Sequence, residues 1–323
     1  MIEQQKQAEM IQQKLSTRVD GTFSIWDHPN FTAKLKLPDD YRPLTSLVEA
    51  LEVMNRLSKE TAQDRLMVLK VVGDAICANE NQLRRYLSSK LSYSQTSAYL
   101  TAMRKYGFID RHQCRLSFSE EDGEQTIKPP APHTLGIAGF LLLSHYYSGD
   151  YFAKPESWFG NSYAIQRYVA LNEIRCRAVE AKIAKGWSWM PRIGGKSKYR
   201  KPTAVLNIAS SSGAVVDMLI FRAQLVQDFI GYFKTLLEEY RYLYDRDGRF
   251  IIDKQSQTNY QIVVLSVSTL NMAKYIAEEI KLESFDFDIW FLVDELFDKS
   301  EGNFAKAFVQ KENGDLRILE LEF

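Results

Sequence analysis

The segment that decides the fold is residues 79–109, which read NENQLRRYLSSKLSYSQTSAYLTAMRKYGFI. Asn79 is a good N-cap residue, and leucines recur at helical spacing behind it, which predicts a short helix over 80–88. A turn follows, and Ala, Leu and Met then recur at helical spacing, which predicts a second helix over about 95–106. Gly107 tolerates the left-handed geometry with which many helices end, so we expect the chain to leave this helix there.

The sequence on either side completes a recognisable arrangement. Apolar residues at helical spacing predict a further helix over 64–78, and after Gly107 a hairpin is expected with its tip at 110–113 and its return strand at 114–118. Three helices followed by a hairpin that begins Gly-Phe-Ile resemble the winged helix-turn-helix. In helix-turn-helix proteins the recognition helix enters the major groove of DNA. We therefore expect double-stranded DNA as the partner of this part of the chain.

The charge distribution supports this expectation. The whole chain has 41 Lys and Arg against 41 Asp and Glu, but residues 79–118 hold seven basic residues against two acidic ones, a net charge of +5. Such a patch supplies sequence-independent affinity for phosphates that weakens with salt. The expected DNA contacts here, with His112 at the hairpin tip, are Arg84, Arg85, Ser94, Gln95, Ser97, Tyr99, Thr101, Arg104, Lys105, Arg111, His112 and Arg115. The alternative is a protein-interaction or dimerisation module whose charges are merely solvated.

Composition changes predict the domain boundaries. An acidic, Gly-containing stretch at 119–124 is followed by three prolines within 129–132, which is typical of an extended linker. The expected divisions are an N-terminal arm and helix at 1–58, a winged helix-turn-helix domain at 59–120, a linker at 121–134 and a second domain at 135–323.

The second domain combines helices and strands. Asn161 is expected to cap a long helix that runs to Gly186, and strands and helices then alternate up to a C-terminal hairpin that turns at 312–315. This order predicts an α/β domain with a mixed sheet, so the whole chain is expected to be α+β. A basic cluster precedes its second strand, and its candidate phosphate contacts are Lys196, Lys198, Arg200 and Lys201, with Tyr199 available for stacking. Its alternative is a solvated loop.

The order of these pieces is similar to that of the replication-relaxation proteins of plasmids and integrative elements. The resemblance covers about 60–323 and rests on a winged helix, a Pro-rich linker, a long helix, a Trp-containing strand, the strand that begins Lys201-Pro202 and a long helix with a Tyr pair. It implies a C-terminal domain similar to the restriction-endonuclease-like fold. That fold would need paired carboxylates around a divalent metal, but Thr203 and Arg222 stand at the matching positions and Asp217 is the only acid on that hairpin. The resemblance therefore implies a degenerate centre with no catalytic residue, metal or cofactor.

The leading hypothesis is a non-enzymatic DNA-binding protein of a mobile element, acting in plasmid replication, conjugative transfer or their transcriptional control. A replication or transfer protein and a second copy of the chain are the further expected partners. Two alternatives stay open: a metal-dependent nuclease built around Asp217, and a protein-binding scaffold with an incidental basic patch. The carboxylate pair Asp294 and Glu295 is expected to be a solvated strand end.

Composition bounds the class of protein. Hydrophobic residues make up 45% and charged residues 25% of the chain, which excludes a fibrous or wholly disordered protein. Three widely spaced cysteines form no CxxC and are expected to be buried thiols. With no apolar run near the length of a membrane helix and no signal-peptide pattern, we expect a cytoplasmic protein without a membrane partner.

Overall fold

The computed structural model of the chain describes residues 11–120, 123–195, 198–209, 213–226, 228–253, 259–298, 303–319 and 321, with the backbone alone at 118–120 and 123–125. The chain forms two compact units. Unit 1 consists of Met1–Pro29 together with Arg177–Phe323, and unit 2 consists of Asn30–Cys176. The two sheets, of five and seven strands, and the helices around them confirm the expectation of a mixed α+β protein.

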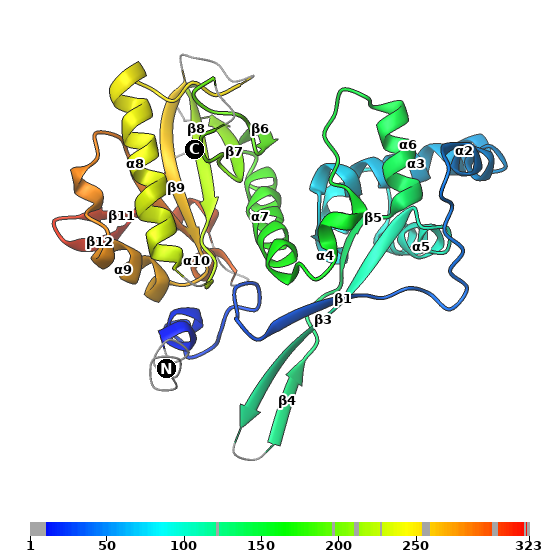
Figure 1. Cartoon of the computed structure of the whole chain (residues 1–323), viewed down its shortest axis with the longest axis horizontal. Helices are drawn as coiled ribbons and strands as arrows, with labels where there is room; N and C mark the ends of the chain where they lie inside the picture. The colour runs from blue at the N-terminus through cyan, green and yellow to red at the C-terminus, as the bar shows by residue number, and fades with distance from the viewer. Residues whose placement is uncertain are drawn as a thin grey trace. The chain divides into compact units, whose positions relative to one another are not determined.

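Unit 2 contains a helical core and a sheet of strands that are far apart in sequence. Its elements are β1 (Phe31–Leu35), α2 (Leu47–Asn55), α3 (Lys59–Ala75), β2 (Ala78–Asn79), α4 (Glu80–Leu87), α5 (Tyr93–Arg104), β3 (Ile109–Glu120), β4 (Gly123–Ile127), β5 (Pro132–Leu135), α6 (Ile137–Tyr146), the 3-10 helix η1 (Pro155–Trp158) and most of α7 (Ser162–Glu180). The strands run in the order β1-β3-β5-β2, and β4 pairs with the far part of β3. In Figure 1, β3 and β4 form a long two-stranded ribbon that extends away from the helices of unit 2.

Unit 1 is built on one mixed sheet. Its elements are β6 (Ala184–Trp189), β7 (Ala204–Ala209), β8 (Val215–Arg222), α8 (Phe229–Asp247), β9 (Tyr260–Val267), α9 (Leu270–Glu279), η2 (Leu282–Ser284), β10 (Ile289–Val293), α10 (Asp294–Phe297), η3 (Phe304–Lys306), β11 (Phe308–Glu312) and β12 (Asp315–Ile318). The strand order is β12-β11-β10-β9-β8-β7-β6, and β9 lies parallel to both of its neighbours. Helices α8 and α9 connect these parallel strands and pack their apolar residues against the sheet in one core (Figure 1).

Several local predictions are confirmed. Helix α4 begins after Asn79, whose side chain accepts a hydrogen bond from the Gln82 backbone, and α7 begins after Asn161, which accepts from the Ala164 backbone. Gly107 has φ +69°, and the C-terminal hairpin turns at Asn313 and Gly314 with positive φ at both residues. The three cysteines are free and buried.

The expected hairpin tip at 110–113 is wrong. These residues lie inside β3, which continues to Glu120 and pairs with β4. His112, Cys114 and Leu116 are buried while the residues between them are more exposed, so the alternation of a strand runs straight through the expected turn.

The expected linker at 121–134 is also wrong. Gly123–Ile127 forms β4, paired with β3, and Pro132–Leu135 forms β5, paired with both β2 and β3. Pro132 is the first residue of its strand, a position where the missing backbone N–H is tolerated. The prolines therefore separate two strands of one unit rather than two domains.

The observed domain boundaries also differ from the expected ones. The division falls within α7, and residues 11–29 belong to unit 1 rather than to a separate arm, since Thr269 donates a hydrogen bond to the Leu15 carbonyl and Asp27 pairs with Arg222. Helix α7 ends at Glu180, and Gly186 lies in β6 instead of ending the helix. A Cβ atom at Gly186 would lie 2.5 Å from Asn207 Oδ1, so close strand packing explains that glycine.

The described helices contain no segment with both the length and the apolar character needed to cross a membrane.

Candidate nucleic-acid interface

Helices α4 and α5 form a tightly capped pair. Asn79 and Gln82 form a capping box at the start of α4, and Ser92 and Gln95 form another at the start of α5. The apolar sides of both helices enter the core of unit 2, with Leu83, Leu87, Leu100 and Met103 all at most 2% exposed. Each helix therefore has a fixed start and a fixed buried side, which determines the side left to solvent.

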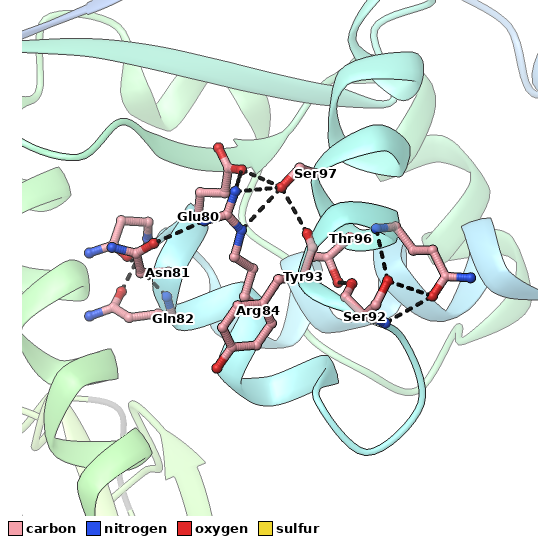
Figure 2. A network of polar contacts seen from close by, with 10 residues as sticks. Glu80, Asn81, Gln82, Arg84, Ser92, Tyr93, Thr96 and Ser97 are labelled. Carbon is pink, nitrogen blue, oxygen red and sulfur yellow. Dashed lines mark hydrogen bonds and ion pairs between the residues drawn. The ribbon is translucent and has the colours of Figure 1, made fainter.

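A polar network joins the two helices, as Figure 2 shows. Arg84 forms an ion pair with Glu80 at 2.6 Å, and its Nε donates to Ser97 Oγ at 3.0 Å. Ser97 Oγ lies in turn 2.6 Å from Glu80 Oε1. Arg84 and Ser97 thus bind each other across the helix pair, and their expected contact with DNA stays a prediction.

Three more of the expected DNA contacts have protein partners. Arg85 pairs with Glu173 at 2.7 Å, Lys105 pairs with Asp40 at 2.9 Å, and Tyr99 donates to Asp64 at 2.9 Å. The two carboxylates opposite Arg85 and Lys105 come from outside residues 79–118, so the local charge estimated from the sequence is too high. Pairing of this kind with distant residues cannot be seen from sequence spacing.

The solvent-exposed side of α5 is more neutral than expected. It consists of six residues: Tyr93, Ser94, Gln95, Ala98, Thr101 and Ala102. Three of the six side chains expected on it from sequence are exposed, whereas Ser97, Tyr99 and Lys105 are half-buried. Tyr93, with 56% of its surface exposed, was missed because the sequence suggested a turn there; its place directly after the N-cap Ser92 was the available signal.

Three arginines continue from α5 into β3. Arg104, the last residue of α5, donates to the Lys36 carbonyl at 2.7 Å. Burial is the main cause that lowers the pKa of Arg104, and the positive charge of Arg111 is the second. Arg115 is exposed on β3. Among the described residues none of these three guanidinium groups forms an ion pair, although the charge of Asp110 acts on Arg104.

The expected position of His112 is wrong. It was expected at an exposed hairpin tip but is 3% exposed inside β3, with Nε2 3.0 Å from Thr134 Oγ1. Burial lowers the pKa of His112 to about 4. A side chain in this position packs within unit 2 and presents no surface to a ligand.

The basic cluster at 196–201 is only partly available. Arg200 pairs with Glu239, whereas Lys198 and Lys201 are exposed and Lys196 lies outside the described residues. Tyr199 is 9% exposed and packs in the core of unit 1, which corrects the expectation that it could stack on a base.

One oxygen of the Asp217 carboxylate is held by two asparagines. Asp217 is buried, and its Oδ1 accepts hydrogen bonds from Asn207 and Asn259, both at 2.7 Å; burial raises the pKa of this carboxyl. In the described part of the chain, no group of three His, Cys, Asp or Glu residues is placed to hold a metal ion.

Arg222 lies in a buried ion triad. Its guanidinium is 2.9 Å from Asp27 and 2.7 Å from Asp294, and its side chain has no exposed surface. Both carboxylate partners of Arg222 thus come from unit 1. Asp294 and Glu295, expected to be solvated, are 6% and 4% exposed. Burial raises the pKa of Asp294 to about 6 although Arg222 opposes the shift.

Comparison of the chain with family models, with curated proteins and with solved structures finds no match.

Proposed function

We propose that unit 2 is a winged helix-turn-helix unit that binds double-stranded DNA through the exposed side of α5. The observation that carries this proposal is the chain path α3-β2-α4-α5-β3-β4-β5, in which β5 pairs with both β2 and β3. It supports the proposal because a winged helix likewise follows a helix-turn-helix with a hairpin, and β2 would be the short strand that closes its sheet. The second helix of such a pair is the one that enters the major groove.

The composition of the α5 surface suits this role. Serine, threonine and glutamine side chains hydrogen-bond to base edges or phosphates, and alanine can contact a thymine methyl group. Arg104 at the end of α5 and Arg111 and Arg115 on β3 would supply phosphate contacts that add affinity to the base-edge contacts. As the resemblance to the replication-relaxation proteins implies, we place this binding in plasmid replication, transfer or their control, with unit 1 as a restriction-endonuclease-like domain that lacks a catalytic centre.

The test places negative charge on the exposed side of α5. Ser94→Glu and Thr101→Glu together would face the phosphates, and like charges across an interface cost several kcal/mol, so duplex affinity should fall roughly tenfold or more. Fluorescence anisotropy with a labelled duplex of mixed sequence measures it. Both positions are exposed, and glutamate is a good helix former, so the fold should be retained.

The matched control is Asn55→Asp with Gln63→Glu. It adds the same charge at exposed positions of α2 and α3 and should leave affinity unchanged. Equal affinity of the α5 variant and the control would refute the proposed role of α5.

A further inference from the structure

Strand β1 adds a surface that lies outside the three helices and the hairpin. It pairs antiparallel with the middle of β3, with Thr32 opposite Arg115 and Lys34 opposite Gln113. The backbone N–H of Lys36 then donates to the Arg111 carbonyl at 2.8 Å, which extends the pairing by one residue. Figure 1 shows β1, in blue, alongside β3.

The two faces of this strand pair differ sharply. Residues directly opposite each other in an antiparallel pair point to the same side. On one side Phe31, His112, Cys114 and Leu116 are at most 5% exposed. The other side carries Thr32, Lys34, Lys36, Arg111, Gln113 and Arg115, which we name the basic sheet face.

The basic sheet face carries uncompensated positive charge. Residues 30–36 and 111–117 contain four basic residues and no acidic one. Lys34, Lys36 and Arg115 are exposed, and within the described part of the chain the four basic side chains form no ion pair. The acid nearest in sequence, Asp110, lies one residue out of phase with Arg111, on the buried side of β3, and burial raises its pKa to about 6.

The chemistry of the face favours nucleic acid over protein. Only hydroxyl and amide side chains separate the basic residues, whereas the centre of a protein–protein interface is apolar and poor in charge. Protein–DNA interfaces are polar and strongly positive. Residues two apart on a strand lie about 7 Å from each other, so the face presents a regular row of cations to a polyanion.

The face also adjoins the proposed DNA-binding helix. Arg104 at the end of α5 donates to the carbonyl of Lys36, and the Arg42 backbone donates to the Lys105 carbonyl at 2.8 Å. The chain that leaves β1 is therefore tied to the end of α5.

We propose that the basic sheet face is a second surface for the phosphate backbone of the duplex, with Lys34 and Lys36 of β1 as its contact residues. This inference rests on the proposed DNA-binding function and extends the contact to a strand that precedes the helix-turn-helix in sequence.

The experiment measures the affinity of the full chain for a labelled duplex of mixed sequence between about 50 and 200 mM salt. Lys34→Ala with Lys36→Ala should reduce the slope of log affinity against log salt by about 1.8, since each lost phosphate contact removes about 0.9, and affinity at the low-salt end should fall roughly tenfold. Lys34→Arg with Lys36→Arg keeps the charge and should keep the slope.

The control removes two positive charges elsewhere. Arg56→Ala with Lys59→Ala, at exposed positions around the start of α3, should leave the slope unchanged. An unchanged slope in the Lys34 and Lys36 double-alanine variant would overturn the inference. The same result is expected if the face binds an acidic protein segment instead of DNA.

The two proposals fail in different ways. If the β1 variant keeps the wild-type slope while Ser94→Glu with Thr101→Glu weakens binding, the inference falls and the proposed function stands. If the β1 variant has a smaller salt-dependence slope while the α5 variant binds DNA normally, the proposed role of α5 is wrong. If the wild-type chain does not bind duplex DNA, both are wrong. Circular dichroism of each variant verifies that the fold is retained.

Discussion

Gly139 shows how a single residue controls the packing of unit 2. It lies in α6, where a Cβ atom would be 2.1 Å from the Phe108 carbonyl oxygen and 2.9 Å from Leu69 Cδ1. Alanine would gain about 1 kcal/mol of helix propensity, but the clash is with backbone and cannot relax cheaply. Gly139→Ala should therefore lower the free energy of unfolding by at least about 2 kcal/mol, measured by urea denaturation.

Gly149 provides the comparison for that variant. No atom lies within 4 Å of the position of its Cβ, and its φ is not positive. Gly149→Ala should leave stability unchanged or raise it by about 0.5 kcal/mol through the unfolded chain. Equal losses at the two glycines would show that the close approach at Gly139 is not what requires glycine there.

His112 gives a pH dependence with a defined sign. Burial lowers the pKa of His112 from 6.5 to about 4, so between these values the unfolded chain binds a proton that the folded chain does not. Above about pH 6.5, His112 is neutral in both states and does not change the free energy of unfolding. Below pH 6.5, that free energy drops by up to about 1.4 kcal/mol per pH unit until about pH 4.

Substitution of this histidine tests the sign. Gln cannot titrate but keeps an amide that can bond to Thr134, so His112→Gln should lose less stability than the wild type between pH 7 and pH 5 in urea denaturation. His133, whose pKa burial lowers to about 3, contributes in the same direction in both proteins. The same decline in wild type and variant would refute the assignment to His112.

At the scale of elements, the start of α4 tests the capping argument. Asn79 is 7% exposed; its side chain accepts from the Gln82 backbone at 3.0 Å, while Gln82 Oε1 accepts from the Asn79 backbone at 3.1 Å. Asn79→Ala should reduce the free energy of unfolding by about 1–2 kcal/mol, and Asn79→Ser, another capping residue, should reduce it less. Urea denaturation of both variants decides it, and an equally large loss with serine would contradict the cap.

Elements were predictable where their signals are local. The extent of α4 and the C-terminal turn follow from a capping residue, apolar spacing and Asn-Gly, which act within a few residues. Strand β3 was cut short because its exposed residues are polar and resemble a turn, and its partners β1 and β5 lie far away in sequence. The part of a strand that pairs only with segments far away in sequence has only a weak local signal.

At the scale of the whole molecule, the N-terminal residues join a sheet nearly two hundred positions away. Asp27 and Asp294 hold the buried Arg222, and loss of one partner of a buried ion group typically costs about 3–5 kcal/mol. Asp27→Asn should therefore lower the calorimetric transition of unit 1, while Gly139→Ala should lower that of unit 2. Asp39→Asn, which removes the same charge from an exposed position, should shift neither.

The outcome also tests the division into units. Variants that shift one common transition by equal amounts would contradict two separately stable units. Selective shifts would support a chain in which the segment before β1 stabilises unit 1 and the segment after it belongs to unit 2.

The sequence by itself determined the helix pair at 79–104, the left-handed exit at Gly107 and the mixed helix and strand content, because caps, glycine and apolar periodicity act over short distances. Only the tertiary structure decided which charges stay uncompensated. Glu173 and Asp40 neutralise two basic residues of the helix pair, while β1 brings Lys34 and Lys36 beside Arg111 and Arg115. Charge on a surface depends on which distant segments meet there, and a count along the chain does not contain that information.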